Sequence, residues 1–154
     1  VFTTPDCRHT QGRVRATKPL TLRGAVVEGL ELTFEGGRVV RADAARGSEV
    51  VEAELDSDPG ARFLGEVALV DGESRIGQSG VIFYSTLLDE NAACHLAYGN
   101  GLAYITNPAA GPEDGANRSS IHTDCMVGGP EVAVYGVDRN GGEVPVLVDE
   151  NWRL

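Results

Sequence analysis

The chain has 154 residues, enough for one domain with a sizeable core, and its 42% hydrophobic and 23% charged residues are typical of a soluble globular protein. A formal net charge of −10 argues against nucleic acid or an anionic membrane as a partner, because like charges repel. No apolar run approaches the ~20 residues that span a bilayer. Three cysteines without a closely spaced pair (Cys7, Cys94 and Cys125) favour a reducing, cytoplasmic compartment over a disulfide framework.

Alternating hydrophobicity predicts strands in the first forty residues. Residues 12–17 alternate between basic and apolar side chains, which is typical of a strand. Residues 24–34 and 38–42 predict two further strands, and Gly36-Gly37 between them is a hairpin signal. The large number of glycines, 20 in all, also indicates many turns and a fold rich in β-structure.

The middle of the chain predicts a helix followed by strands. Residues 44–55 carry apolar side chains at helical spacing, and a run of Asp, Ser, Pro and Gly ends this helix. Residues 64–70 predict a buried strand, residues 71–81 a long loop, and residues 81–84 a short strand.

The last third of the chain predicts one more helix and a hairpin. Residues 87–98 have helical character, with acidic residues near the start and a glycine after the end. Residues 106–118 form a loop rich in Pro, Gly, Asn and Asp, and residues 131–137 and 143–148 predict strands joined at an Asn-Gly turn. The fold class is therefore α+β, with a mixed or antiparallel sheet, two main helices and several hairpins.

The triplet His122-Thr123-Asp124 is the clearest candidate for a functional site. Flanking apolar residues indicate a buried strand that ends at Gly128. On a strand, side chains two residues apart point to the same side, so the imidazole and the carboxylate lie together. Such a pair can bind a divalent metal, although most triplets of this kind bind nothing.

Glu66 lies inside the apolar run at residues 64–70, where a buried carboxylate needs a partner or a metal. Three arrangements remain open from the sequence alone. The carboxylate can pair with Arg62 or Arg118, can point outward at a sheet edge, or can bind a metal.

His95 falls in the predicted helix at residues 87–98, where Asn91 shares its face at i, i+4 and can orient the ring. The alternative is a partly buried histidine near a helix end, which the helix macrodipole would favour. Glu90 is expected in the first turn of this helix and can also support a neighbouring site.

Other residues of metal-binding type have simpler explanations. His9 lies in a polar stretch and is expected in a solvated loop, while Cys94 and Cys125 are expected to face the core. Two carboxylates and two imidazoles then remain, a suitable ligand set for zinc, cobalt or manganese. These residues are Glu66, His95, His122 and Asp124.

Several blocks in this order resemble the thermophilic metalloaminopeptidases, the family of aminopeptidases T, S and PepS. The blocks are residues 1–6, 12–19, 64–70, 83–95, 117–124 and 129–132. The motifs are Leu64-Gly65-Glu66, Asn91-Ala92-Ala93-Cys94-His95 and His122-Thr123-Asp124. The resemblance covers essentially the whole chain.

The resemblance implies a longer enzyme, in which residues 1–154 form a single domain, the C-terminal catalytic part. That family uses two divalent metal ions (zinc, cobalt or manganese) to remove residues from peptides with free N-termini. The resemblance also implies an upstream N-terminal domain and a homodimer. By motif, the family's metal ligands correspond to Glu66, His95, His122 and Asp124.

The resemblance assigns two catalytic residues less directly. The family has a tyrosine near the metals where this chain has Leu102, and Tyr104 is the nearest substitute. Glu90 is a candidate general base. A further glutamate ligand of the family lies just before the segment that residues 1–3 resemble, so we expect the 154-residue chain alone to hold a two-metal site poorly and to lack full activity. A non-catalytic interaction or oligomerisation domain and a mononuclear zinc hydrolase are the alternatives.

Overall fold

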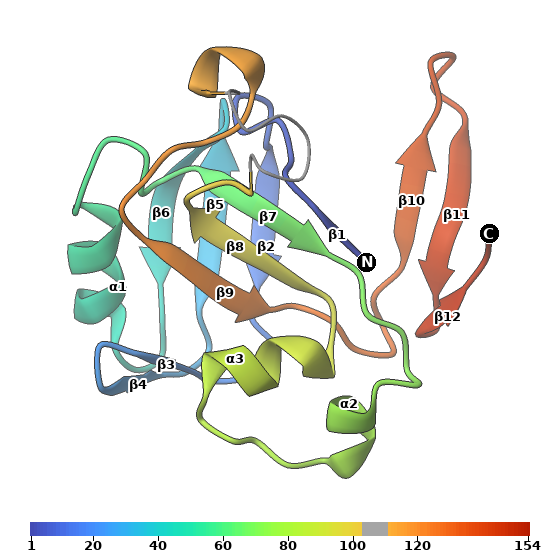
Figure 1. Ribbon diagram of the computed structural model, residues 1–154, viewed down its shortest axis with the longest axis horizontal. Helices are drawn as coiled ribbons and strands as arrows, with labels where there is room; N and C mark the ends of the chain where they lie inside the picture. The colour runs from blue at the N-terminus through green and yellow to red at the C-terminus, as the bar shows by residue number, and fades with distance from the viewer. Residues whose placement is uncertain (103–110) are drawn as a thin grey trace.

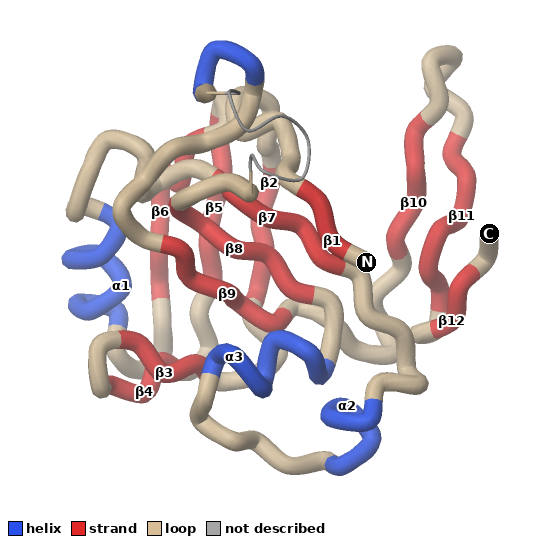
Figure 2. Tube along the Cα trace, in the orientation of Figure 1, coloured by secondary structure: helices blue, strands red, loops and turns tan. Residues whose placement is uncertain are grey.

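The computed structural model describes residues 1–102 and 111–154. The described part contains four β-sheets and several short helices (Figures 1 and 2). The strands are β1 (Phe2–Thr3), β2 (Gly12–Arg15), β3 (Leu20–Leu22), β4 (Ala25–Val27), β5 (Glu31–Glu35), β6 (Arg38–Asp43), β7 (Leu64–Ala68), β8 (His95–Gly99), β9 (His122–Met126), β10 (Val134–Val137), β11 (Glu143–Val148) and β12 (Asn151–Trp152). The helices are α1 (Ser48–Leu55), α2 (Arg75–Ser79) and α3 (Thr86–Asp89), with 3₁₀ turns η1 (Glu90–Ala92) and η2 (Pro112–Asp114).

A four-stranded antiparallel sheet in the order β1-β7-β8-β9 forms the centre of the molecule. Behind it in Figure 1 lies the three-stranded sheet β2-β5-β6, with the hairpin β3-β4 and α1 along one side. The sheet β10-β11-β12 extends away from this body at the other side. The strand pairings are antiparallel, which confirms the α+β class.

The main hydrophobic core lies between the central sheet, the sheet β2-β5-β6 and α1. The second sheet and its hairpin contribute buried side chains such as Leu32, Phe34 and Val39, and β7 to β9 contribute Tyr98 and Cys125. A fully buried side chain of this size stabilises the fold by about 1.5–3 kcal/mol. Because one face of the central sheet is used for this core, its other face is available for polar side chains.

The sequence predicted several of these elements correctly. The hairpin at Gly36-Gly37 joins β5 to β6, and both glycines have positive φ (55° and 84°). The turn between β10 and β11 also falls at the predicted Asn-Gly pair, with Gly141 at φ 82°. The predicted strand at residues 24–34 is two strands, β4 and β5, because the chain turns at Gly29 with φ 63°.

Two predictions around His95 are wrong. Residues 81–84 form no strand, and residues 87–98 do not form one helix. The chain leaves α3 and η1 at Ala93, whose φ of −161° and ψ of 169° are extended, and β8 begins at His95. Pairing of β8 with strands on both sides outweighs the helical propensity of its Leu and Ala residues. Asn91 therefore shares no helical face with His95.

Within residues 1–102 and 111–154, no helix is long and apolar enough to cross a membrane.

Candidate functional site

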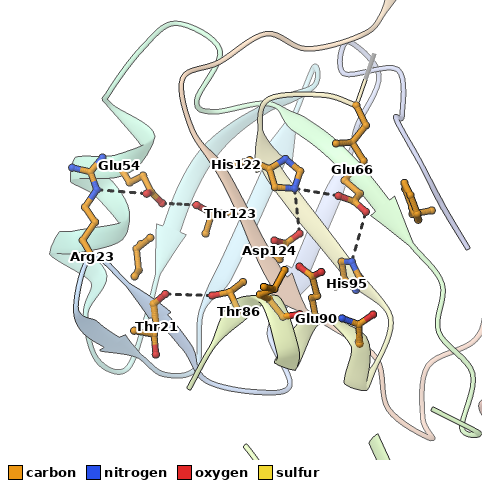
Figure 3. A pocket seen from close by; sticks show the side chains of 15 residues that line it. Thr21, Arg23, Glu54, Glu66, Thr86, Glu90, His95, His122, Thr123 and Asp124 are labelled. Atoms are coloured by element: carbon orange, nitrogen blue, oxygen red, sulfur yellow. Dashed lines mark hydrogen bonds and ion pairs between the residues drawn. The ribbon is translucent and has the colours of Figure 1, made fainter. Parts of the chain in front are cut away.

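Strand register places four of the candidate side chains on one face of the central sheet. Glu66 of β7 pairs with Ala97 of β8, which in turn pairs with Asp124 of β9. Two residues from Ala97 on either side, Gly99 pairs with His122 of β9 and His95 itself pairs with Ala68 of β7. Side chains directly opposite each other in neighbouring strands share a face, so the three strands bring these groups together (Figure 3).

The side chains converge on the Glu66 carboxylate. Its Oε2 lies 3.1 Å from His122 Nε2, and its Oε1 lies 3.7 Å from His95 Nε2. Asp124 Oδ1 is 3.4 Å from His122 Nε2. One potential ligand atom from each of Glu66, His122 and Asp124 lies within 4.8 Å of the others. Glu66, His95 and Asp124 are all buried, with exposures of 6–7%.

Main-chain carbonyls orient both imidazole rings. His122 Nδ1 lies 2.8 Å from the Asn100 carbonyl oxygen, and His95 Nδ1 lies 3.2 Å from that of Ala93. A carbonyl only accepts, so the Nδ1 of a neutral ring carries the proton and donates it. Each Nε2 then presents its lone pair to the carboxylates, which is the arrangement that metal-binding histidines usually have.

The local charge favours a cation at this position. Contact with the Asp124 carboxylate, together with the Asn100 carbonyl and the charge of Glu66, raises the pKa of His122 to about 9 despite its partial burial. A proton and a divalent cation would therefore compete for its Nε2.

Asp124 supplies the observation that tests whether a metal fits. Its Oδ1 is buried and accepts no hydrogen bond among the described residues, apart from the 3.4 Å ion-pair contact with His122 Nε2. A buried carboxylate oxygen without a donor is costly unless a cation satisfies it. The donor set of carboxylate and imidazole groups suits zinc, cobalt or manganese, so the residues fit a divalent metal.

Glu90, in η1, completes the acidic side of the site. Desolvation raises the pKa of its carboxyl, and the charges of Asp124 and Glu66 add to this effect, while His95 opposes it. The Glu90 carboxyl therefore keeps a proton to a higher pH than an exposed glutamate does. A group tuned in this way is suited to proton transfer.

A buried hydrogen-bond network supports β9 from the opposite face of the sheet. Glu54 of α1 is 5% exposed, and its Oε2 accepts hydrogen bonds from Tyr98 Oη (2.8 Å) and Thr123 Oγ1 (2.9 Å). Arg23 Nε lies 3.5 Å from its Oε1. Thr123 stands between His122 and Asp124, so this network fixes the strand that carries both.

The turn that precedes His122 is also anchored. Asp58 Oδ2 accepts hydrogen bonds from Ser119 Oγ (2.9 Å), Ser120 N (2.7 Å) and Ser120 Oγ (2.7 Å). These bonds, those of Ser120 above all, hold the pKa of the Asp58 carboxyl well below its usual range. Sequence reasoning missed both supporting acids. The sequence does indicate that Glu54 is buried, because it follows Val51 by three positions on the apolar face of a helix. For Asp58 the sequence indicates only a turn.

The remaining candidates lie elsewhere. Cys125 faces the core and Cys94 contacts the main chain of Val70, as expected. His9 is exposed and pairs with Asp6. Arg62 contacts Glu52 and Asp56, so it is not the partner of Glu66. Tyr104 lies outside the described residues.

A cavity of about 620 Å³ opens over the site. The candidate side chains Glu66, Glu90, His95, His122 and Asp124 line one part of it, and Thr21, Arg23 and Glu54 line another (Figure 3). The cavity is therefore large enough for more than an ion and a water molecule.

Comparison with known proteins identifies relatives over the whole chain. The sequence profile of the family described as thermophilic metalloprotease (M29) matches residues 1–152. The chain is 44% identical to aminopeptidase T of Thermus aquaticus and to aminopeptidase 2 of Geobacillus stearothermophilus, and 39% identical to aminopeptidase PepS of Streptococcus thermophilus. Each alignment covers 99% of this chain and 38% of the relative.

A solved structure has the same fold. Wild-type AmpT from Thermus thermophilus superimposes with a TM-score of 0.92 at 41% sequence identity, over 99% of this chain and 39% of that one. The chain therefore spans about two fifths of the length of the proteins that it matches.

Proposed function

Because the chain belongs to the thermophilic metalloprotease (M29) family, we propose that it forms the metal-binding part of an aminopeptidase. This enzyme would remove N-terminal residues from peptides. The observation that carries the proposal is the convergence of two histidine Nε2 atoms on Glu66, with the Asp124 carboxylate against one of them. The curated relatives, which are named aminopeptidases, support the reaction class.

Two divalent ions (zinc, cobalt or manganese) are proposed, and the two oxygens of Glu66 support this number. Oε1 faces His95 and Oε2 faces His122, so each oxygen shares its surroundings with a different imidazole. Glu66 would therefore contribute to the binding of both ions. Glu66, His95, His122 and Asp124 would hold them, together with any ligand supplied by the rest of the protein.

When bound, the ions would polarise the scissile carbonyl and lower the pKa of a bound water toward ~7. The chain itself would supply proton transfer and substrate orientation. The raised pKa of Glu90 makes its ionised carboxylate a stronger base, so this group would accept the proton of the attacking water and pass it to the leaving amine. The acidic surroundings would also attract the positively charged N-terminus of a peptide.

The wider organisation expected from the family resemblance is part of the same proposal. It comprises a cytoplasmic homodimer in which an N-terminal domain of the same protein completes the enzyme. Light scattering on the full-length protein would measure the oligomeric state directly.

Replacement of His122 or Asp124 by alanine is expected to reduce metal content more than stability. Each change removes a group that faces the proposed ions, while β9 remains held by its neighbours and by Glu54. Elemental analysis of the full-length protein gives the metal content, and hydrolysis of leucine arylamide gives the activity.

His9→Ala is the matched control, since His9 is exposed and paired only with Asp6 among the described residues. Unchanged metal stoichiometry in His122→Ala and Asp124→Ala would refute the assignment. One ion per chain with full activity would favour a mononuclear hydrolase, and no metal binding at all would favour a non-catalytic interaction domain.

Ala97→Val is expected to lower metal content and activity together. Ala97 lies between Glu66 and Asp124 in the sheet and is fully buried, so it leaves space between the two carboxylates. Overpacking at such a position typically costs about 1–3 kcal/mol, which urea unfolding would measure.

Ala61→Val is the control, because Ala61 is equally buried but lies in the turn before β7. The control should lose stability without losing metal. Equal metal content in both variants would contradict the role of Ala97 as the small residue between the carboxylates.

A further inference from the structure

β9 is the last strand of the central sheet, and its register shows which main-chain groups point outward. Asn100 N donates to Ile121 O at 2.6 Å, and Val127 N donates to Cys94 O at 2.8 Å. Hydrogen-bonded pairs alternate with non-bonded pairs in an antiparallel ladder. In the register of β8 and β9, Thr123 and Cys125 therefore bond to β8, whereas His122, Asp124 and Met126 direct their N–H and C=O groups to the outer edge.

One of these outward groups is already hydrogen-bonded to another segment of the chain. The Met126 carbonyl accepts a hydrogen bond from Thr17 N at 2.8 Å, which confirms the direction deduced from the register. The preceding stretch differs: no described residue outside the sheet bonds to the main chain of His122 or Asp124. The edge of β9 is thus hydrogen-bonded at one end, while its main-chain groups beside the candidate site have no partner among the described residues.

The cavity extends around this open edge. His122, Thr123 and Asp124 all line it, although consecutive residues of a strand point to opposite faces. A cavity that contacts all three must pass along the strand edge itself. Figure 3 shows the same arrangement, with Glu66 and His95 on one side of β9 and Glu54 and Arg23 on the other.

We propose that a peptide substrate binds as a short extended strand along the edge of β9, with its main chain paired to the N–H and C=O groups of His122 and Asp124. This proposal rests on the proposed aminopeptidase function and adds to it the part of the substrate beyond the first residue. Strand addition recognises the main chain, so it holds peptides of different sequence alike. The strand that carries two of the proposed metal ligands would then also position the peptide bond to be cleaved.

The first experiment compares substrates of the metal-loaded full-length protein. The substrates are leucine arylamide, the peptide Leu-Ala-Ala-Ala-Ala, and this peptide with a methyl group on the nitrogen of the second, the third or the fourth peptide bond. Alternate N–H groups of a strand face the same edge, so methylation of either the second or the third bond is expected to lower kcat/KM about 3- to 10-fold for each main-chain hydrogen bond lost. Methylation of the fourth bond, which lies beyond the two residues of β9 with unpaired main-chain groups, should have little effect.

Hydrolysis of the arylamide tests the proposed function separately, because this substrate has no main chain beyond the first residue. If the arylamide is cleaved and all three methylated peptides react like the parent peptide, strand addition is overturned while the enzyme assignment stands.

The second experiment does not depend on turnover. Amide hydrogen exchange of the full-length protein is followed by NMR with Leu-Ala-Ala-Ala whose first peptide bond is reduced to CH₂–NH. The N–H groups of His122 and Asp124 should exchange at least ~10-fold more slowly with the peptide bound. The N–H of Thr123, already bonded to β8, is the internal control. Equal exchange at His122 and Asp124 with and without peptide would overturn the proposal, whatever the activity of the enzyme.

Discussion

Glu66→Gln is expected to reduce metal affinity and kcat/KM by more than ~100-fold, since loss of a group that only supports a ligand already costs 10- to 100-fold. The substitution keeps the shape of the side chain but removes its charge. It also places an NH₂ group toward one of the two histidine Nε2 atoms, where Glu66 has an oxygen on each side. An uncharged amide would hold divalent cations less tightly than the carboxylate.

Titration of the metal-free full-length protein with zinc, followed by the leucine arylamide assay, measures both quantities. Glu35→Gln removes the same charge at the exposed end of β5 and is the control. Without metal, Glu66→Gln removes an ion-pair partner of His122 and also the repulsion between Glu66 and Glu90, so the free energy of unfolding should change much less than metal affinity. If the variant still binds two ions with unchanged affinity, Glu66 is not one of the metal ligands.

Glu54→Ala is expected to lower the free energy of unfolding by about 3 kcal/mol, because the buried hydroxyls of Tyr98 and Thr123 lose their acceptor. Burial, with Cys125 and Glu54 nearby, raises the pKa of Tyr98 far above its usual value, so its hydroxyl stays protonated and needs an acceptor. Glu54→Gln keeps an oxygen for these hydroxyls and should cost less.

Urea unfolding of both variants gives the stability difference. Glu52→Ala on the same helix is the control: its carboxylate pairs with Arg62 and is 43% exposed, so its loss should cost less than ~1 kcal/mol. Equal stability losses in Glu54→Ala and Glu52→Ala would show that the network beneath β9 is not a significant support.

The sequence predicted the parts of the site that depend on local periodicity. His122 and Asp124 lie two residues apart on a strand, and Glu66 lies inside a buried strand, as their apolar neighbours indicated. His95 was placed on a helix because Leu, Ala and acidic residues surround it. Its strand conformation comes from pairing with β7 and β9, which are distant in sequence and carry no local signal.

The supporting residues were harder to predict for the same reason. The hydrogen bond from Thr123 to Glu54 joins residues 69 positions apart, and that from Ser119 to Asp58 joins residues 61 positions apart. Such contacts depend on how the elements pack, and a single sequence shows only that an acid lies on an apolar helix face.

The carbonyl groups that hold the two imidazoles have a consequence for evolution. Every amino acid carries a main-chain carbonyl, so the partners of His122 and His95 do not depend on the identities of Asn100 and Ala93. Substitution at these two positions can change packing or loop contacts and still leave the ring orientation intact. The direction of both Nε2 atoms therefore depends on the path of the backbone. The side chains at these positions can change during evolution without changing the orientation of the two rings.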